Sequence, residues 1–172
     1  SIDTGSIGCV SPGKVSSKGM VFDGINDYVT ITDECVYDID QTTRVSLSAW
    51  IKTSDTCIPL IAKKATCSSS KGWEFGINCA GQLDFRMTNT SSSNELRIRG
   101  DTSVNTCIWT HVAVTYNGIP GCGANAVEIY INNVLDTKGV ISTNLTSCIL
   151  NNSVVSYGAY EDGSSKYTGS MD

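Results

Sequence analysis

The sequence of 172 residues is poor in basic residues, in histidine and in long apolar runs. Its 12 lysine and arginine residues stand against 17 acidic ones, giving a formal net charge of -5, and they form no basic patch. This balance argues against nucleic acid as a partner. No apolar run approaches the roughly 18 residues of a membrane span, and the first ten residues lack the basic start and apolar core of a signal sequence. We therefore expect a mature or trimmed chain that does not insert into membranes.

Histidine occurs once, at His111, beside Trp109 at the start of a candidate strand. Nucleophilic catalysis needs a serine or cysteine held by a base, and no such arrangement is evident. We interpret His111 as a structural residue.

The eight cysteines are spread along the chain and never form a C-x-x-C pair. An even number at wide spacing predicts disulfides, because zinc sites use Cys or Cys/His pairs at short spacing. Free thiols in a reducing compartment are the alternative. Eight cysteines allow about 105 pairings, so no connectivity is predicted. The cysteines are Cys9, Cys35, Cys57, Cys67, Cys79, Cys107, Cys122 and Cys148.

Three Asn-x-Ser/Thr triplets begin at Asn89, Asn144 and Asn151. Such triplets are acceptors for N-glycosylation in exported proteins. Disulfides also form and persist outside the cytosol. The two features together predict an extracellular or cell-surface location.

Apolar and polar residues alternate in many short segments, and no segment keeps a period of 3.6 residues. Examples are 45–51, 73–77, 83–87 and 112–116. Turn signals separate these segments. Ala80-Gly81 and Asn132-Asn133 predict hairpins, and Asn117-Gly118 ends the segment before it. The pattern predicts an all-β, antiparallel two-sheet jelly-roll sandwich, folded as a single domain over residues 1–172.

An acidic turn lies between two strand-like runs in the stretch Met20 to Ile31. Asp23 and Gly24 begin the turn and Asp27 ends it. Carboxylates one turn apart are the hard oxygen ligands that Ca²⁺ prefers. The alternative is a turn whose carboxylates accept hydrogen bonds from their own backbone.

Six blocks in order, MVFDGINDYVTI, VSLSAWIKT, GWEFGI, WTHVAVTY, VEIYINNVL and YTGSMD, resemble the laminin-G-like and pentraxin-like jelly rolls of the concanavalin A-like lectin/glucanase superfamily. The resemblance covers nearly the whole chain. It implies two antiparallel sheets, a concave face and often one Ca²⁺ shared by the acidic turn and the closing G-x-x-D block. The matching positions are Asp23, Asp27 and Asp172.

Members of this superfamily usually continue past the G-x-x-D block into a last strand that pairs near the N-terminus. The resemblance therefore implies that the chain lacks its last strand, which leaves a sheet edge unpaired. Glucan hydrolases of the superfamily carry two catalytic carboxylates in an E-x-D-x-x-E block on one strand. That block is absent from this sequence. We predict a protein that is not an enzyme.

Binding is the remaining route to function. Arg86, Arg97 and Arg99 fall on the polar sides of their strands, and Trp50 projects away from the apolar face of its strand. Arginines and an aromatic ring on one sheet face suit a glycan. The alternative is a solvated outer sheet with cross-strand ion pairs and a covered Trp50.

These observations predict a calcium-stabilised module for adhesion or carbohydrate binding, with a glycan or a surface protein as its partner. The rival hypothesis is a structural subunit of a surface layer, filament or particle. Such a subunit would self-assemble through lateral contacts or by strand addition at an open edge.

Overall fold

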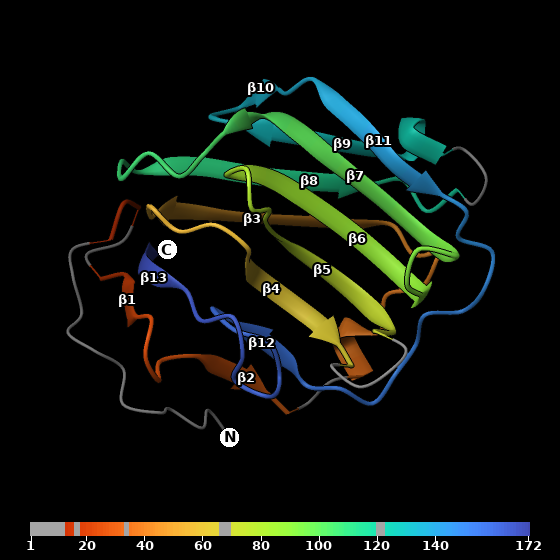
Figure 1. Ribbon diagram of the computed structural model, residues 1–172, viewed down its shortest axis with the longest axis horizontal. Coiled ribbons are helices and arrows are strands. Elements are labelled where there is room, and N and C mark those ends of the chain that lie inside the picture. Colours follow the sequence, from red (N-terminus) through yellow and green to blue (C-terminus); the bar gives the residue numbers. More distant parts are fainter. Residues whose placement is uncertain (1–12, 16–17, 33–34, 66–69, 120–122) are drawn as a thin grey trace.

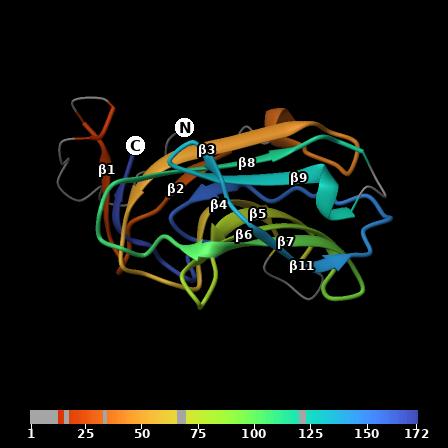
Figure 2. The same cartoon turned by 90° about the horizontal axis from the view of Figure 1, so that it is seen from above.

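The computed structural model of the protein describes residues 13–15, 18–32, 35–65, 70–119 and 123–172. Two antiparallel sheets are stacked face to face, which confirms the predicted all-β jelly-roll sandwich (Figures 1 and 2). No helix among these residues is long and apolar enough to cross a membrane.

The first sheet has six strands. Their order is β1 (Met20–Asp23), β13 (Thr168–Met171), β3 (Val45–Lys52), β8 (Thr110–Tyr116), β9 (Val127–Ile131) and β10 (Val134–Leu135). The second sheet has seven strands. Their order is β11 (Lys138–Thr143), β7 (Asn94–Ser103), β6 (Gln82–Thr90), β5 (Gly72–Ile77), β4 (Ile58–Lys64), β12 (Val155–Tyr157) and β2 (Val29–Ile31). Two short 3₁₀ helices, η1 (Cys35–Tyr37) and η2 (Gly123–Ala126), lie in the connections.

The core lies between the two sheets. Successive side chains of a strand point to opposite faces, so the alternating segments place one apolar stripe inside. Val112 and Val114 of β8 are buried, as are Trp73 and Phe75 of β5. Each large apolar side chain buried in this way contributes about 1.5–3 kcal/mol.

The predicted hairpins are confirmed. β5 and β6 pair in antiparallel register from Gly72↔Thr88 to Ile77↔Leu83. Asn132 and Asn133 join β9 to β10 with φ angles of 50° and 65°. Asparagine tolerates this left-handed backbone, which a two-residue hairpin of the common type requires at both positions.

The C-terminal block forms a paired strand, β13, and the last strand expected after this block stays a prediction. β13 pairs with β1 over four residues, from Met20↔Met171 to Asp23↔Thr168. It also pairs with β3, but only at Ser170↔Lys52 and Met171↔Ile51. β13 is therefore an interior strand that covers one end of β3.

Candidate functional site

The outer face of the seven-stranded sheet is hollowed over strands β4 to β7. The cavity measures about 580 Å³, and its lining includes charged residues of β5, β6 and β7. These residues alternate along their strands with core residues such as Phe75, Phe85 and Ile98. The two-residue period of each strand therefore turns a row of charges outward over a fixed apolar layer.

Gly76 of β5 allows the backbones of β4 and β5 to approach closely at the floor of this hollow. A Cβ at this position would lie 2.4 Å from the carbonyl oxygen of Ile58 and 3.0 Å from Cα of Pro59. The register between β4 and β5 shifts between Pro59 and Ile61. A larger residue at position 76 would fill the floor and push β4 away.

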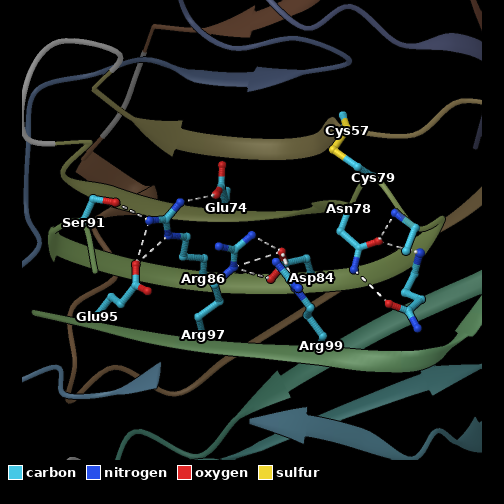
Figure 3. A network of polar contacts seen from close by, with 12 residues as sticks. Cys57, Glu74, Asn78, Cys79, Asp84, Arg86, Ser91, Glu95, Arg97 and Arg99 are labelled. Carbon is cyan, nitrogen blue, oxygen red and sulfur yellow. Dashed lines mark hydrogen bonds and ion pairs between the residues drawn. A yellow bond between two sulfur atoms is a disulfide. The ribbon is translucent and has the colours of Figure 1, made fainter. Parts of the chain in front are cut away.

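Asp84 of β6 holds two arginines of β7 (Figure 3). Arg97 donates from Nε to both carboxylate oxygens of Asp84 at 3.1 and 3.0 Å, and from Nη2 to Oδ2 at 2.6 Å. Arg99 donates only from Nε, at 3.4 Å. The hydrogen bonds to Asp84 raise the pKa of Arg97 above its usual value. The carboxylate thus orients both guanidinium groups across the hollow.

Arg86 of β6 is fully engaged by neighbouring side chains (Figure 3). Its Nε and Nη2 donate to Oε2 of Glu95 at 2.9 and 2.7 Å, and Nη2 also donates to Ser91 Oγ at 2.7 Å. Its Nη1 lies 3.7 Å from Glu74. Arg86 stands directly opposite Arg97 in the β6–β7 register. Like charges in that position repel, so the two diagonal acids hold this pair of arginines together.

Tyr160 closes one side of the hollow from the segment between β12 and β13. Its hydroxyl donates to Glu74 Oε2 at 2.7 Å, and Lys64 Nζ donates to Glu74 Oε1 at 2.9 Å. The Lys64 ammonium also lies 5.3 Å from the centre of the Tyr160 ring. Burial, with the negative charge of Glu74, raises the pKa of Tyr160. The phenol therefore stays protonated and polar at neutral pH.

A disulfide lies at the other rim of the hollow (Figure 3). It joins Cys57, just before β4, to Cys79, just after β5, with a Cα–Cα distance of 4.4 Å. Next to it, Asn78 Oδ1 accepts from the N–H groups of Ala80 and Gln82 at 2.8 and 3.1 Å. The disulfide and the tied turn brace this end of the β4–β5 pair.

Two arginines have N–H groups that donate to no acceptor among the described residues. Among the described residues, Arg99 bonds only with Asp84, and its side chain is 33% exposed, against 13% for that of Arg86. Arg97 leaves its Nη1 without a partner in the described structure. Planar guanidinium groups bind carboxylates through parallel N–H donors. The hollow can therefore accept an anionic group from solvent.

The structure does not bring Trp50 to the three arginines. Trp50 lies on β3, in the other sheet, and its ring contacts that of His111 with centroids 5.3 Å apart and ring planes tilted by 57°. Lys14 Nζ lies 5.3 Å from the same ring. The expectation that Trp50 and the arginines share one face is wrong, because alternation assigns a side of a strand and not the sheet that the strand joins.

The three acids proposed for calcium are also separated. Asp23 Oδ1 accepts from the N–H groups of Ile25 and Asn26 at 2.7 and 3.2 Å, and Asp27 Oδ2 accepts from the Asp23 N–H at 3.1 Å. The bonds from Ile25 and the rest of the turn lower the pKa of Asp23. Asp172 instead follows the end of β13 that pairs with Met20, at the opposite end of β1 from Asp23.

The three-acid site therefore does not form, and no group of three or more metal-ligating side chains occurs among the described residues. The turn matches the alternative in which carboxylates bond their own backbone. Calcium binding through Asp23 and Asp27 alone stays a prediction.

The other cysteines and the glycosylation triplets fall at several places. Cys35, Cys107 and Cys148 are exposed and have no disulfide partner among the described residues, while Cys9, Cys67 and Cys122 lie outside them. Pairing of these six stays a prediction. Among the triplets, Asn89 donates its amide to Cys148 O at 2.7 Å, and Asn151 donates its amide to Lys71 O at 3.0 Å. Asn144 is exposed and its side chain has no such bond in the described structure.

Sequence comparison identifies the family. Residues 23–172 match a laminin G model described as the concanavalin A-like lectin/glucanases superfamily. The chain belongs to this superfamily. No protein with a curated description matches the sequence.

Several solved structures share this fold at low sequence identity. The carbohydrate-binding module CBM40 of Ruminococcus gnavus IT-sialidase, in a structure bound to α2,3-sialyllactose, has a TM-score of 0.62 at 12% identity, covering 90% of this chain and 88% of that one. Domains LG4-5 of the mouse laminin α1 chain give 0.58 at 10%, covering 99% and 42%. A heptameric SAP-like pentraxin from Limulus polyphemus gives 0.56 at 15%, covering 88% and 71%. At these identities the likeness concerns the fold.

Sequence analysis missed Tyr160, Lys64 and the position of the disulfide at the hollow. Glu74, Asp84 and Glu95 are visible in the sequence as single acidic residues on polar strand faces. Their partners depend on strand register, and the β6–β7 register shifts between Gln82 and Asp84. No signal within the individual strands predicts that shift.

Proposed function

We propose that this protein binds acidic glycans in the hollow on the outer face of the seven-stranded sheet. The observation behind the proposal is that Arg97 and Arg99 are oriented by Asp84 and still have donors without partners in the described structure. A carboxylate of a sugar accepts these donors, and Arg99 contributes most because it is the most exposed of the three arginines.

The charge of the hollow supports an anionic ligand. Four cations, Lys64, Arg86, Arg97 and Arg99, surround three carboxylates, Glu74, Asp84 and Glu95. One positive charge is therefore left over. Because the ion pairs fix the guanidinium groups before the ligand arrives, little side-chain entropy is lost on binding.

The comparisons add indirect support. The Ruminococcus gnavus module is described as a carbohydrate-binding module bound to α2,3-sialyllactose, a glycan with an acidic sugar. Its fold resembles that of this chain over most of both chains. We infer a non-catalytic role in carbohydrate binding or adhesion, because the three carboxylates of the hollow are all engaged in ion pairs. The disulfide supports an extracellular or cell-surface location.

Isothermal titration with α2,3-sialyllactose and lactose tests the proposal. We expect measurable binding of the acidic sugar, at least tenfold weaker binding of lactose, and at least tenfold loss of acidic-sugar affinity in Arg99→Met. Arg44→Met is the matched control, because Arg44 is an exposed arginine just before β3 in the other sheet. Trp50→Ala should bind as the wild type does.

Equal affinity for sialyllactose and lactose would contradict the carboxylate contact. Equal loss in Arg99→Met and Arg44→Met would show a general charge effect and contradict the assignment of the site. Absence of binding to a wide array of acidic glycans would remove the proposal.

A further inference from the structure

Gly139 of β11 is the one described glycine whose surroundings and backbone do not call for a glycine. Its φ is not positive, so its backbone suits other residues. A Cβ at this position would meet no heavy atom within 4 Å. Every other described glycine has a positive φ or would place a Cβ within 3.1 Å of another heavy atom. The fold itself therefore does not explain the glycine at position 139.

The bulge of β11 does not explain it either. The register of β11 against β7 shifts between Val140 and Ser142, after the regular pair Gly139↔Arg99. Where a bulge selects glycine, that residue takes the left-handed backbone, which Gly139 lacks. A glycine inside a strand packs no side chain and weakens the strand, so it often marks a place where a ligand approaches the backbone closely. Position 139 fits that description.

Gly139 lies beside the most exposed arginine of the hollow. It stands directly opposite Arg99, on the strand next to β7 (Figure 1). Side chains directly opposite in an antiparallel pair share one face, with Cβ atoms about 4.5–5.5 Å apart. On its other side, Arg99 stands opposite its ion-pair partner, Asp84 of β6. The side toward β11 has no side chain at this position, so Arg99 is left uncovered there.

The next outward position of β11 is also small. Ser142 stands opposite Arg97. Its Oγ donates to Glu95 O at 3.2 Å and has lone pairs that can accept from a sugar hydroxyl. The hollow is bounded elsewhere by Tyr160 and by the disulfide. Its rim is therefore low at β11, where two small residues stand opposite the two arginines that have open donors.

We propose that Gly139 forms the floor of a second sugar subsite, so that the glycan leaves the hollow across β11. This inference rests on the proposed function, because it takes the acidic unit to be bound at Arg99. The sugar linked to that unit lies over Gly139, with the C–H face of its ring against the bare backbone and its hydroxyls toward Ser142. The ligand class is an acidic oligosaccharide whose second unit is a neutral sugar. A side chain at position 139 would occupy the place of that ring.

Isothermal titration of Gly139→Ile with two ligands tests the proposal. The ligands are α2,3-sialyllactose and the methyl α-glycoside of its acidic sugar, which has no second unit. We expect the wild type to bind sialyllactose at least fivefold more tightly than the methyl glycoside. In Gly139→Ile this advantage should disappear, while the affinity for the methyl glycoside stays within twofold. Thr143→Ile, also exposed on β11 but opposite Leu96, is the matched control and should keep the advantage.

Two further measurements separate this role from a structural one. Isoleucine favours strands more than glycine does, so a thermal melt of Gly139→Ile should show a Tm no lower than that of the wild type, although sialyllactose binds less tightly. The second measurement needs no variant. The NMR signal of the wild-type Gly139 amide should shift with saturating sialyllactose and stay in place with the methyl glycoside.

The outcomes distinguish the second subsite from the acidic site itself. Equal wild-type affinities for the two ligands, or an unchanged advantage in Gly139→Ile, would overturn the subsite at Gly139 and leave the acidic site at Arg99 standing. An equal loss of both affinities in Gly139→Ile would show that the new side chain covers Arg99, and would also overturn the subsite. Absence of binding for both ligands would overturn the proposed function and this inference with it.

Discussion

The two outer faces of the sandwich differ in how they use polar residues. On the seven-stranded sheet, acids and arginines of neighbouring strands bond one another over a hollow, and Glu95 and Asp84 are nearly buried although they lie on an outer face. On the six-stranded sheet, β3 presents the small residues Ser46 and Ser48, and the ring of Trp50 contacts that of His111 on β8.

The difference shows that the same alternation of apolar and polar residues produces different outer surfaces on the two sheets. Small polar residues on the six-stranded face are solvated and interchangeable at little cost. Charges on the seven-stranded face are desolvated in part, so each depends on its partner. Fixed charge in a hollow is the arrangement that favours ligand binding.

The largest expected effect comes from filling the hollow. In Gly76→Ala the new Cβ would meet the Ile58 carbonyl oxygen at 2.4 Å, whereas at Gly139, in the same sheet, nothing lies within 4 Å. We expect Gly76→Ala to lower the free energy of unfolding by about 3 kcal/mol and to weaken glycan binding. Gly139→Ala is the control and should change stability by less than about 0.5 kcal/mol. Urea unfolding of both variants measures this; equal stabilities would contradict a tightly packed floor.

Removal of an acid should distinguish the two faces more directly. Asp84→Asn leaves Arg97 and Arg99 without their carboxylate, and we expect a loss of about 2 kcal/mol. Glu128→Gln is the counterpart on the six-stranded sheet, where Glu128 is exposed and accepts from Tyr130. It should cost no more than about 0.5 kcal/mol. A similar cost for both variants would remove the contrast between the faces.

The raised pKa of Tyr160 predicts how stability responds to alkali. The folded-state pKa of Tyr160 lies above the ordinary tyrosine value of about 10. Its contribution is therefore complete below about pH 10 and is lost as the pH rises above this value, because the unfolded chain then releases the proton first. Tyr160→Phe should make the free energy of unfolding fall less steeply above pH 10. Unfolding titrations from pH 8 to 11 test this, and an unchanged slope would contradict the burial of the phenol.

Calcium at the Asp23–Asp27 turn is the smallest expected effect. Both carboxylates already accept backbone N–H groups, so we expect millimolar Ca²⁺ to raise Tm by only about 2–4 °C, as a gain near 1 kcal/mol does for a domain of this size. The rise should vanish in Asp23→Asn and persist in Asp172→Asn. A thermal melt with and without chelator measures it, and loss of the rise in both variants would restore the three-acid site.

Much of the fold could be predicted from the sequence, because alternation and turn chemistry are local. Asn132 and Asn133 turn the chain as predicted, and the 73–77 and 83–87 segments pair as a hairpin. The pairing of β13 with β1 joins segments from opposite ends of the sequence. Pairing partners so distant in sequence leave no local pattern.

The candidate site was predictable only in part. Arg86, Arg97 and Arg99 lie outward on neighbouring strands, as alternation indicates. Which arginine keeps open donors depends on where Asp84 and Glu95 sit across the strands, and the register shifts that decide this come from bulges. Trp50 and Asp172 were misassigned because their neighbours are set by the order of strands in the sheets.

The Cys57–Cys79 disulfide makes the stability of the β4–β5 hairpin depend on the redox environment of the protein. It closes a loop with a sequence separation of 22 that contains all of β4 and β5, and a closure of this length restricts the unfolded chain by about 3 kcal/mol. In a reducing compartment that restriction disappears, and the β4–β5 hairpin becomes free to fray from its Cys57–Cys79 end. The arginines of β6 and β7 and their partners Asp84 and Glu95 lie outside the loop, so reduction would loosen the floor at Gly76 while these ion pairs stay in place.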